Sequence, residues 1–395
     1  MRGSARRVAI TGLGVVAPCG LGKEAFWKGL LGPGITDHKT IHIQDWDPLP
    51  YFDNPKDARR ADRVEQMALA AAAEAMTQAG NLGIDPSRIG TIFGTGVGGL
   101  GTLEEQIRVL VEKGERRVSP FLVPMMMANA AGAAISMRYG LRGPNETICT
   151  ACAASTHSIG YAARQIAWGM CDAVVTGGSE AAGVPIAIAS FGNMTALSTS
   201  GASKPFDKDR DGFVLGEGAA VLVLEEWENA KRRGATILGE VLGAASNADA
   251  HHITAPSPGG VGAIGCMQLA LADAELSPAD IKQINAHGTS TPLNDAAEAA
   301  AVAHVFGPSG GPAVVSTKGV TGHALGAAGA LEAAAVLLSM QYRLIPPTAG
   351  TTNIDPDFSI DLVTGAPRPW DPGPTMSNSF GFGGHNGSII LAPAS

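Results

Sequence analysis

The same succession of elements occurs twice along the chain: a helix, a proline, a short strand and a turn that contains glycine and threonine. In the first half these are residues 61–79, Pro86, 89–93 and 94–96, and in the second half residues 267–274, Pro278, 281–285 and 286–289. Repetition on this scale predicts two similar α/β halves, each a sheet covered by helices. The chain has 395 residues, more than the roughly 250–300 that one core can serve. We place the boundary at the Arg232-Arg233-Gly234 break, giving halves of residues 1–234 and 235–395.

The composition favours a globular protein of a reducing compartment. Apolar residues make up 45% and charged residues 16% of the chain, and its 52 glycines suit the many tight turns of a large α/β protein. Five cysteines, an odd number, argue against a disulfide framework, so we expect a cytoplasmic protein. The net charge of −8 gives no general reason to bind nucleic acid.

The longest uncharged apolar stretch lies between Arg117 and Arg138. It contains two prolines, an asparagine and a glycine, which fit a folded core better than a membrane span. We therefore predict that this stretch forms buried core and pocket lining, and we expect neither membrane insertion nor an apolar leader.

Cys152 lies at a predicted strand-to-helix junction. Thr147 and Ile148 end a β-branched run, small residues surround the cysteine, and residues 155–168 can form a helix. The positive end of that helix would favour the reactive thiolate over a thiol whose ordinary pKa is about 8.5. Residue type alone supports a buried, inert cysteine equally well. Cys149 and Cys152 also spell C-x-x-C, so a redox pair or half of a zinc site are further alternatives.

Two histidines of the second half, His287 and His323, lie in glycine-rich turns, and Lys318 is close to them in sequence. Small neighbours would leave both imidazole rings accessible. A thiol with two histidines can act as an activated nucleophile, bind a thioester carbonyl or hold zinc. Because no paired metal-ligand spacing accompanies them, we expect no metal.

A loose dinucleotide-binding pattern, G-x-G-x-x-A, occurs at residues 12–17. Pro18 and Gly20 interrupt the helix that should follow it, and no strand ending in an acidic residue comes at the usual distance. A nicotinamide-dependent oxidoreductase is therefore kept only as an alternative.

Five motifs together carry a resemblance to a known family. They are Thr-Ala-Cys-Ala-Ala-Ser at 150–155, Pro-Phe-Asp-Lys-Asp-Arg-Asp-Gly-Phe-Val-Leu-Gly-Glu-Gly at 205–218, Asn-Ala-His-Gly-Thr-Ser-Thr-Pro at 285–292, Ser-Thr-Lys-Gly-Val-Thr-Gly-His at 316–323 and Asn-Ser-Phe-Gly-Phe-Gly-Gly-His-Asn at 378–386. In this order they resemble the β-ketoacyl-acyl-carrier-protein synthases of the thiolase superfamily, especially the type II elongating enzymes of bacterial fatty acid synthesis. The resemblance implies a thiolase fold of five layers, α-β-α-β-α, with two duplicated halves, and a homodimer.

The resemblance also implies an acyltransferase, a 3-oxoacyl-[acyl-carrier-protein] synthase. Such an enzyme joins acyl and malonyl thioesters of acyl carrier protein by decarboxylative Claisen condensation. Cys152 would take the acyl chain, and His287 and His323 would promote decarboxylation and stabilise the enolate. Lys318 and Glu332 match the family's supporting charged pair.

Further positions follow from the same resemblance. The backbone N–H groups of Cys152 and Phe382 would form an oxyanion hole, and Phe382 would gate the acyl pocket. The phosphopantetheine arm would be bound by two threonines, Thr289 and Thr291. The acyl chain would be contacted by apolar residues, namely Leu103, Phe121, Leu122 and Phe380.

Basic residues of the first half are candidates for docking the carrier protein. Lys56, Arg59, Arg60 and Arg63 are predicted to share one face of a short helix, although a solvated face interleaved with acidic residues would look the same. The resemblance implies that Lys56, Arg59, Arg60 and Lys204 contact the acidic carrier protein. The phosphopantetheine arrives on that carrier, so no resident cofactor is expected.

Two departures from the family pattern leave the substrate and pathway open. His385 stands where threonine is common, and Leu293-Asn294 replaces a residue plus glycine before Asp295. One alternative is the ketosynthase of a type II polyketide or specialised-lipid pathway. Another is a non-enzymatic subunit similar to a chain-length factor, paired with a ketosynthase as a heterodimer, but such subunits typically lack the nucleophilic cysteine.

Overall fold

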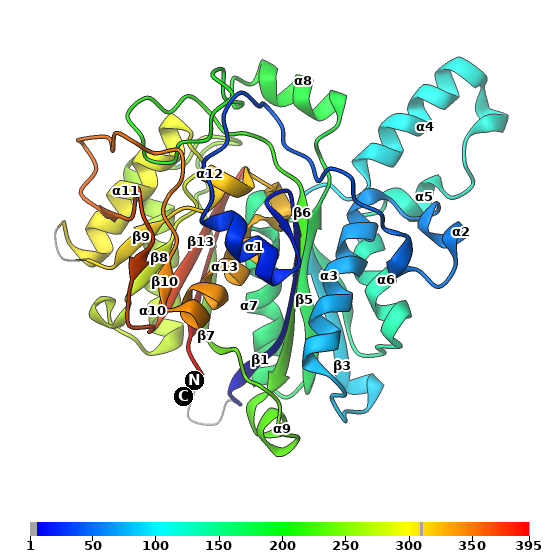
Figure 1. Cartoon of the computed structure of the whole chain (residues 1–395), viewed down its shortest axis with the longest axis horizontal. Coiled ribbons are helices and arrows are strands. Elements are labelled where there is room, and N and C mark those ends of the chain that lie inside the picture. Colours follow the sequence, from blue (N-terminus) through cyan, green and yellow to red (C-terminus); the bar gives the residue numbers. More distant parts are fainter. Residues whose placement is uncertain (1–5, 309–310, 395) are drawn as a thin grey trace.

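The computed structural model describes residues 6–308 and 311–394. The strands of the first half are β1 (Val8–Ala17), β2 (Gly20–Leu21), β3 (Ile89–Gly94), β4 (Asn145–Ile148), β5 (Ala173–Glu180) and β6 (Gly218–Glu226). Those that follow are β7 (Gly239–Ala248), β8 (Gln283–Asn285), β9 (Ala313–Val315), β10 (Leu344–Ile345), β11 (Asp361–Leu362), β12 (Arg368–Pro369), β13 (Thr375–Gly381) and β14 (His385–Ala392). The main sheet has the order β11-β9-β8-β13-β14-β7-β1-β6-β5-β3-β4 (Figure 1).

Both halves of this sheet have the same topology. In each half the first strand pairs antiparallel with the last, β1 with β6 and β7 with β14, and the last pairs antiparallel with β5 or β13. Two parallel strands follow in each half, β3 and β4 beside β5, and β8 and β9 beside β13; β11 adds one more parallel strand at the edge of the second half. The halves join where β1 and β7 pair at Ala9 with Glu240 and Ile10 with Gly239. The duplicated α/β architecture predicted from the repeat is confirmed.

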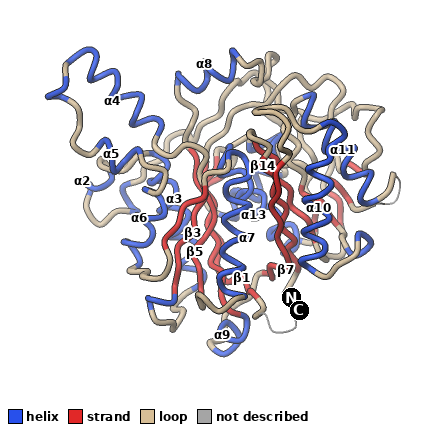
Figure 2. Tube along the Cα trace, turned by 180° about the vertical axis from the view of Figure 1, so that it is seen from behind, coloured by secondary structure: helices blue, strands red, loops and turns tan. Residues whose placement is uncertain are grey.

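Helices form three layers around the two halves of the sheet. The first half is covered on its outer face by α3 (Arg63–Ala79) and α6 (Ala130–Tyr139), and the second half by α10 (Val261–Ala274) and α11 (Pro292–Phe306). Between them lie α7 (Ala154–Ala167) and α13 (Ala328–Tyr342), as Figure 2 shows. The order is therefore α-β-α-β-α, as expected. The remaining α-helices are α1 (Lys23–Leu30), α2 (Pro55–Ala58), α4 (Leu100–Lys113), α5 (Leu122–Met126), α8 (Pro185–Asn193), α9 (Trp227–Arg232) and α12 (Lys318–Thr321).

The middle layer requires small residues because it packs on both sides. Every residue of α13 from 328 to 340 is buried. A Cβ atom added at Gly329 would lie 1.9 Å from the Oγ1 atom of Thr156 on α7. The apolar stretch Leu325–Tyr342 is long enough to cross a membrane, but 89% of it is buried inside the fold. This apolar stretch is therefore part of the protein core.

The dinucleotide-like glycines lie inside a strand. Gly12 and Gly14 belong to β1, where added Cβ atoms would lie 2.3 Å from the carbonyl oxygen of Ala75 and 2.0 Å from that of Ala71 on α3. The pattern therefore marks close contact between a strand and a helix, and its interpretation as a phosphate-binding loop is wrong.

The basic residues near the start of α3 do not share one helical face. Asp62 caps α3 in a capping box with Glu65, and α2 ends before it at Ala58. Arg63 then turns towards Glu217, with 2.6 Å between Nη2 and Oε1. The prediction of a single basic face was wrong because the N-cap at Asp62 starts a new helix.

An arm formed by α4 and α5 extends from the body of the molecule (Figure 1). Within the uncharged stretch predicted to be buried, Val123 is 57% and Met137 is 77% exposed. Ile135 on α6 is fully buried, because one face of this helix packs on β3. The prediction of buried core therefore holds for one face of α6 and is wrong for much of the rest.

Candidate active site

Cys152 lies where the chain turns sharply from β4 into α7. The backbone φ of Ala151 is +49°, a left-handed conformation that costs energy for a residue with a side chain. One 3-10 turn, Ala151–Ala153, precedes α7. The predicted strand-to-helix junction is confirmed. The turn presents the sulfur to the second half of the molecule.

His323 of the second half meets this sulfur. It follows α12, and its Nε2 atom lies 3.0 Å from Cys152 Sγ, with both residues buried. Its backbone N–H donates to the carbonyl oxygen of Val214, and its ring meets the edge of Phe213 at 5.2 Å. The imidazole is therefore placed as a direct proton partner of the thiol.

His287 follows β8, and its protonation is set by Lys318. The backbone N–H groups of His287 and Gly288 donate to the two carboxylate oxygens of Glu298, at 2.8 and 2.7 Å. Lys318 Nζ lies 3.4 Å from His287 Nδ1, donates to the His287 carbonyl oxygen at 2.5 Å and contacts Glu332. Because an ammonium group only donates, Nδ1 accepts and the ring hydrogen is on Nε2.

Burial makes the central groups neutral. It raises the pKa of the Cys152 thiol to about 12, although the Lys318 charge and the Phe382 N–H oppose the shift. Burial and the Lys318 charge lower the pKa values of His287 and His323 well below the usual range. For Cys152 the loss of hydration on burial, which favours the thiol, is the largest effect on the pKa, so the helix end expected to favour the thiolate acts against a larger opposing effect. The thiol must lose its proton as it reacts.

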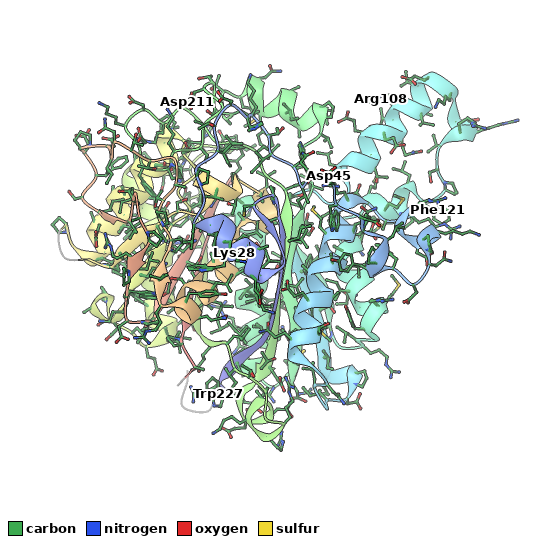
Figure 3. The ribbon with its side chains drawn as sticks, viewed as in Figure 1. Lys28, Asp45, Arg108, Phe121, Asp211 and Trp227 are labelled. Carbon is green, nitrogen blue, oxygen red and sulfur yellow. The ribbon has the colours of Figure 1, made fainter. Side chains whose placement is uncertain are left out.

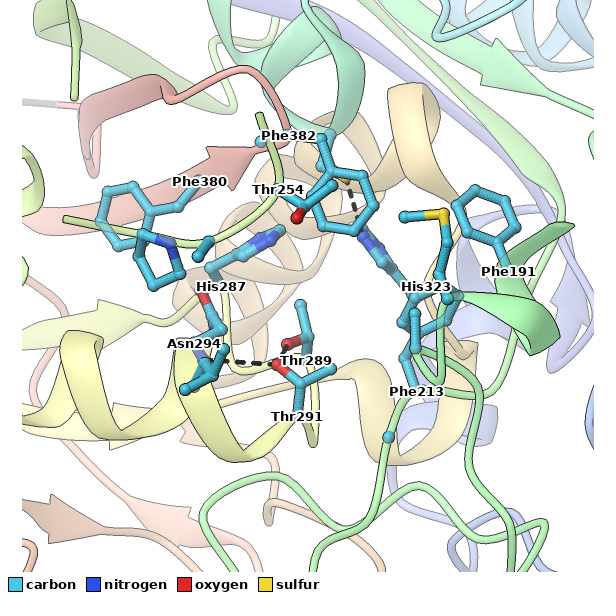
Figure 4. A pocket seen from close by; sticks show the side chains of 18 of the residues that line it. Phe191, Phe213, Thr254, His287, Thr289, Thr291, Asn294, His323, Phe380 and Phe382 are labelled. Carbon is cyan, nitrogen blue, oxygen red and sulfur yellow. Dashed lines mark hydrogen bonds between the residues drawn. The ribbon is translucent and has the colours of Figure 1, made fainter. Parts of the chain in front are cut away.

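A cavity of about 520 Å³ contains this group (Figure 4). Cys152, His287 and His323 form its floor, and Thr289 and Thr291, whose hydroxyl oxygens are 2.9 Å apart, lie on one side. Its aromatic side chains are Phe191, Phe213, Phe380 and Phe382. Apart from Lys318 and Glu332, which touch each other behind His287, the structure gathers all the predicted catalytic residues around one space.

Phe382 lies in the turn between β13 and β14. Its backbone N–H points at Cys152 Sγ, and its ring lies 6.5 Å from the Phe191 ring. The neighbouring Phe380 ring lies 6.0 Å from the His287 ring. The turn thus brings a backbone donor and an aromatic side chain to the nucleophile.

Three residues predicted to contact the acyl chain lie elsewhere. Leu103 is on α4, and Phe121 and Leu122 are at the start of α5; none of them lines the cavity around Cys152. Phe121 is 37% exposed on the arm, and its ring lies 4.4 Å from the Arg60 guanidinium carbon (Figure 3). Their acyl-binding role stays a prediction.

The docking candidates lie in two places. Lys56, Arg59 and Arg60 are exposed near the arm. Lys204 is half-buried near the cavity, where its backbone N–H donates to Ser290 Oγ at 3.0 Å and its Nζ donates to the carbonyl oxygen of Asp209.

The ligand atoms of Cys152, His287 and His323 lie within 4.8 Å of one another, so they could hold a soft cation such as Zn²⁺. A metal at His287 Nε2 would have to displace the hydrogen that Lys318 keeps there. The geometry suits proton transfer and hydrogen-bond donation without that rearrangement.

Two family models match the chain. The model of the beta-ketoacyl synthase N-terminal domain matches residues 34–230, and that of the C-terminal domain matches residues 238–352. The chain belongs to the β-ketoacyl synthase family.

Relatives of this β-ketoacyl synthase match over its whole length. The 3-oxoacyl-[acyl-carrier-protein] synthase 2 of Vibrio harveyi is 43% identical over 411 residues, covering 98% of this chain and 99% of the relative. A beta-ketoacyl synthase from Burkholderia phymatum STM815 superimposes with a TM-score of 0.91 at 34% identity, covering 99% and 100% of the two chains. A type II polyketide ketosynthase, solved with its acyl-carrier protein and bound to a hexaketide, gives 0.90 at 31% identity and the same coverage.

Reasoning from sequence missed part of the aromatic wall of this β-ketoacyl synthase. Phe213 lies in the motif at 205–218, so the motif could have indicated it. Phe191 on α8 has no such signal, because its place in the wall depends on how α8 packs over the cavity.

Proposed function

We propose that this β-ketoacyl synthase condenses the acyl group of acyl-acyl-carrier-protein with malonyl-acyl-carrier-protein, releasing CO₂ and giving 3-oxoacyl-acyl-carrier-protein in fatty acid elongation. The observation that carries the proposal is the 3.0 Å contact between Cys152 Sγ and His323 Nε2, beside His287 in one buried cavity. The Vibrio harveyi relative, a 3-oxoacyl-[acyl-carrier-protein] synthase 2, supports the same reaction.

The first step transfers the acyl group to the enzyme. The thiol proton of Cys152 passes to His323 Nε2 while the sulfur adds to the thioester carbonyl. The oxyanion accepts hydrogen bonds from the backbone N–H groups of Cys152 and Phe382. The bond between the carbonyl carbon and the carrier sulfur then breaks, and the carrier sulfur takes the proton that His323 holds. Thr289 and Thr291 would hold the phosphopantetheine arm by their hydroxyl groups. Neutral groups suit this step, because no stable charge must form before the substrate arrives.

The second step forms the carbon–carbon bond. Malonyl thioester loses CO₂, and the released electron pair becomes an enolate whose oxygen faces the two imidazoles. Lys318 keeps a hydrogen on His287 Nε2, so this ring donates to the enolate oxygen. The enolate carbon attacks the acyl carbonyl, the bond between that carbon and the Cys152 sulfur breaks, and the sulfur takes up one proton from the solvent by way of His323 Nε2, because the overall reaction consumes one proton. Glu332 balances the Lys318 charge in the absence of bulk water.

The proposed assembly is a cytoplasmic homodimer. Among the described residues, β4 pairs with β3 alone and is the last strand of the sheet. The neighbouring arm carries exposed apolar side chains, including Val111 and Val123. An open strand edge beside apolar surface supports association with a second copy. In such a dimer Leu103, Phe121 and Leu122 would contact the partner's acyl chain or its pocket.

The proposed partner is acyl carrier protein, an acidic protein. On this chain, a positively charged surface to which the carrier protein would bind is formed by the exposed Lys56, Arg59 and Arg60. A further cation near the cavity is Lys204. Charge reversal at Arg59 and Arg60 should raise the KM for acyl carrier protein more than the KM for a small acyl thioester. Equal loss with both substrates would contradict docking at these residues.

The decisive experiment is incubation of the purified protein with acyl- and malonyl-acyl-carrier-protein, followed by mass spectrometry of the products. We expect 3-oxoacyl product from the native protein and at least a thousandfold less from Cys152→Ala. If the native protein gives no product alone but product forms once a partner ketosynthase is added, the chain-length-factor alternative is favoured. Undiminished product from Cys152→Ala would refute the proposed nucleophile.

A second candidate is the same condensation in a type II polyketide or specialised-lipid pathway. It is favoured by the similarity to the polyketide ketosynthase and by Asn294, a departure from the elongating enzymes that lines the cavity. The mass of the chain trapped on Cys152 from a mixture of acyl carrier thioesters distinguishes the two. Simple saturated chains support elongation, and polyketone chains support the second candidate.

A further inference from the structure

One side chain forms hydrogen bonds with both halves of the molecule next to the nucleophile. His157 lies on α7, five residues after Cys152. Its Nδ1 is 2.8 Å from the hydroxyl oxygen of Thr150, in the loop that carries the nucleophile. Its Nε2 is 3.0 Å from the carbonyl oxygen of Asn386, on β14 of the second half.

These partners fix the state of the imidazole ring. A carbonyl oxygen only accepts, so Nε2 carries the hydrogen, and Nδ1 accepts from the Thr150 hydroxyl. Burial lowers the pKa of His157, an effect to which His385 and Arg164 add and which the Asn386 carbonyl opposes. The ring is neutral, and both of its nitrogens are occupied by hydrogen bonds.

The two segments that His157 joins are also the two that carry the backbone donors. Thr150 precedes the strained turn at Ala151 and Cys152. Asn386 follows the turn that carries Phe382, and its side chain is itself fixed by hydrogen bonds to Asn247 and Asp249 on and after β7. The two segments come from opposite halves of the fold, so their separation is set by contacts between the halves.

The second-half segment packs closely against the ring and against the nucleophile loop. An added Cβ atom at Gly387 would lie 2.9 Å from the His157 ring, and one at Gly381 would lie 3.0 Å from the backbone nitrogen of Cys152. This packing leaves the ring little freedom to move. Loss of its two hydrogen bonds would remove the polar link between the nucleophile loop and the start of β14, and only packing contacts such as that between Gly381 and Cys152 would then set the separation of the two segments.

We propose that His157 is a positioning residue that holds the backbone N–H groups of Cys152 and Phe382 at the separation needed for both to bind one oxyanion. The inference rests on the proposed function. In acyl transfer the Cys152 sulfur bonds to the thioester carbon, the carbonyl electron pair moves to oxygen, and collapse of the intermediate expels the carrier sulfur. His157 touches none of these atoms and acts through the two segments that it joins.

The test separates acyl transfer from decarboxylation. His157→Phe keeps a ring of similar size without its hydrogen bonds, and His157→Gln keeps one donor and one acceptor. Ser158→Ala is the matched control, because the Ser158 hydroxyl bonds to Ala154 within α7. Single-turnover intact-protein mass spectrometry measures acylation of Cys152 by acyl carrier protein. CO₂ release from malonyl carrier protein measures the step assigned to His287 and His323.

We expect His157→Phe to slow acylation at least tenfold and to change CO₂ release less than twofold. His157→Gln should recover acylation to within threefold of the native rate, and Ser158→Ala should change neither rate more than twofold. If His157→Phe does not fold, Thr150→Val removes one of the two bonds and should slow acylation about threefold without slowing CO₂ release.

An equal loss in both rates, an unchanged acylation rate in His157→Phe, or a His157→Gln variant as slow as His157→Phe would overturn the inference. If acyl carrier protein acylates Cys152 of the native protein, each of these results counts against the inference about His157 and not against the proposed function. A native protein that cannot be acylated would overturn both.

Discussion

The three candidate catalytic side chains of this β-ketoacyl synthase are almost fully buried, and burial favours their uncharged forms. Cys152 is 6% exposed, and His287 and His323 are 1% and 3% exposed. Burial disfavours the thiolate and both imidazolium ions, and the two charged groups behind them, Lys318 and Glu332, touch each other. The reactivity of these side chains therefore depends on the transfer of a proton over a short, fixed distance when substrate is present.

The pH dependence of Cys152 alkylation tests this protonation state. Burial raises the thiol pKa to about 12, so at neutral pH the thiolate fraction of Cys152 is much smaller than that of an ordinary cysteine. The rate of iodoacetamide reaction at Cys152 should rise with pH from 7 to 10 without a plateau. Site-resolved mass spectrometry separates it from Cys149, which is exposed. A plateau between pH 6 and 8 would indicate a thiolate–imidazolium pair instead.

At the scale of elements, the middle helical layer determines how close the two halves approach. On α13, Gly329 faces Thr156, and the Thr156 hydroxyl forms a 2.7 Å hydrogen bond with Ser379 on β13. On α7, a Cβ atom added at Gly160 would lie 2.7 Å from the Cβ of Ala244 on β7. Small residues at these contacts bring the strand ends that carry the catalytic groups together.

Gly329→Ala should destabilise the protein. The added Cβ would lie 1.9 Å from Thr156 Oγ1, so α7 and α13 must separate, and overpacking of this kind costs about 1–3 kcal/mol. Urea unfolding should give a lower midpoint. Gly192→Ala on α8 is the control, since an added Cβ there meets nothing within 4 Å, and its free energy of unfolding should stay the same or rise by up to about 1 kcal/mol. Similar values for both variants would show that the α7–α13 contact can relax.

At the scale of the whole molecule, the site exists only where the two halves meet. Cys152 comes from the first half, and His287, His323 and Phe382 come from the second. The arm formed by α4 and α5 contributes nothing to the cavity lining, yet it exposes apolar side chains beside the open edge of β4. A face of this kind is expected to bind a second copy of the chain.

Charges placed on that face should reduce the molecular mass in solution. Val123 and Met137 are 57% and 77% exposed, and replacing both with glutamate would bury unpaired charges in a dimer interface. We expect light scattering to give a dimer for the native protein and a monomer for the double variant. The control is Val261→Glu on α10, 67% exposed on the other half, which should stay dimeric. A dimeric double variant would contradict the proposed interface.

Much of the fold followed from local patterns. The repeat predicted two similar halves, and the strand, small residues and helix around Cys152 were confirmed because turn chemistry and periodicity act over a few residues. One prediction from a local pattern, the shared helical face of the basic residues, was wrong. The four basic residues at 56–63 matched a helical face, but the N-cap at Asp62 divides that segment into two helices.

The sequence by itself predicted the duplicated architecture from its repeat, and short motifs indicated the family and singled out the thiol and the two histidines as candidate site residues. Only the tertiary structure decided that burial favours the neutral thiol, that Phe191 joins the cavity wall and that the stretch before Arg138 has exposed apolar side chains such as Val123 and Met137. The physical reason is that hydration and side-chain contacts depend on segments far apart in the chain. Cys152 and His323 are separated by 171 residues and meet at 3.0 Å.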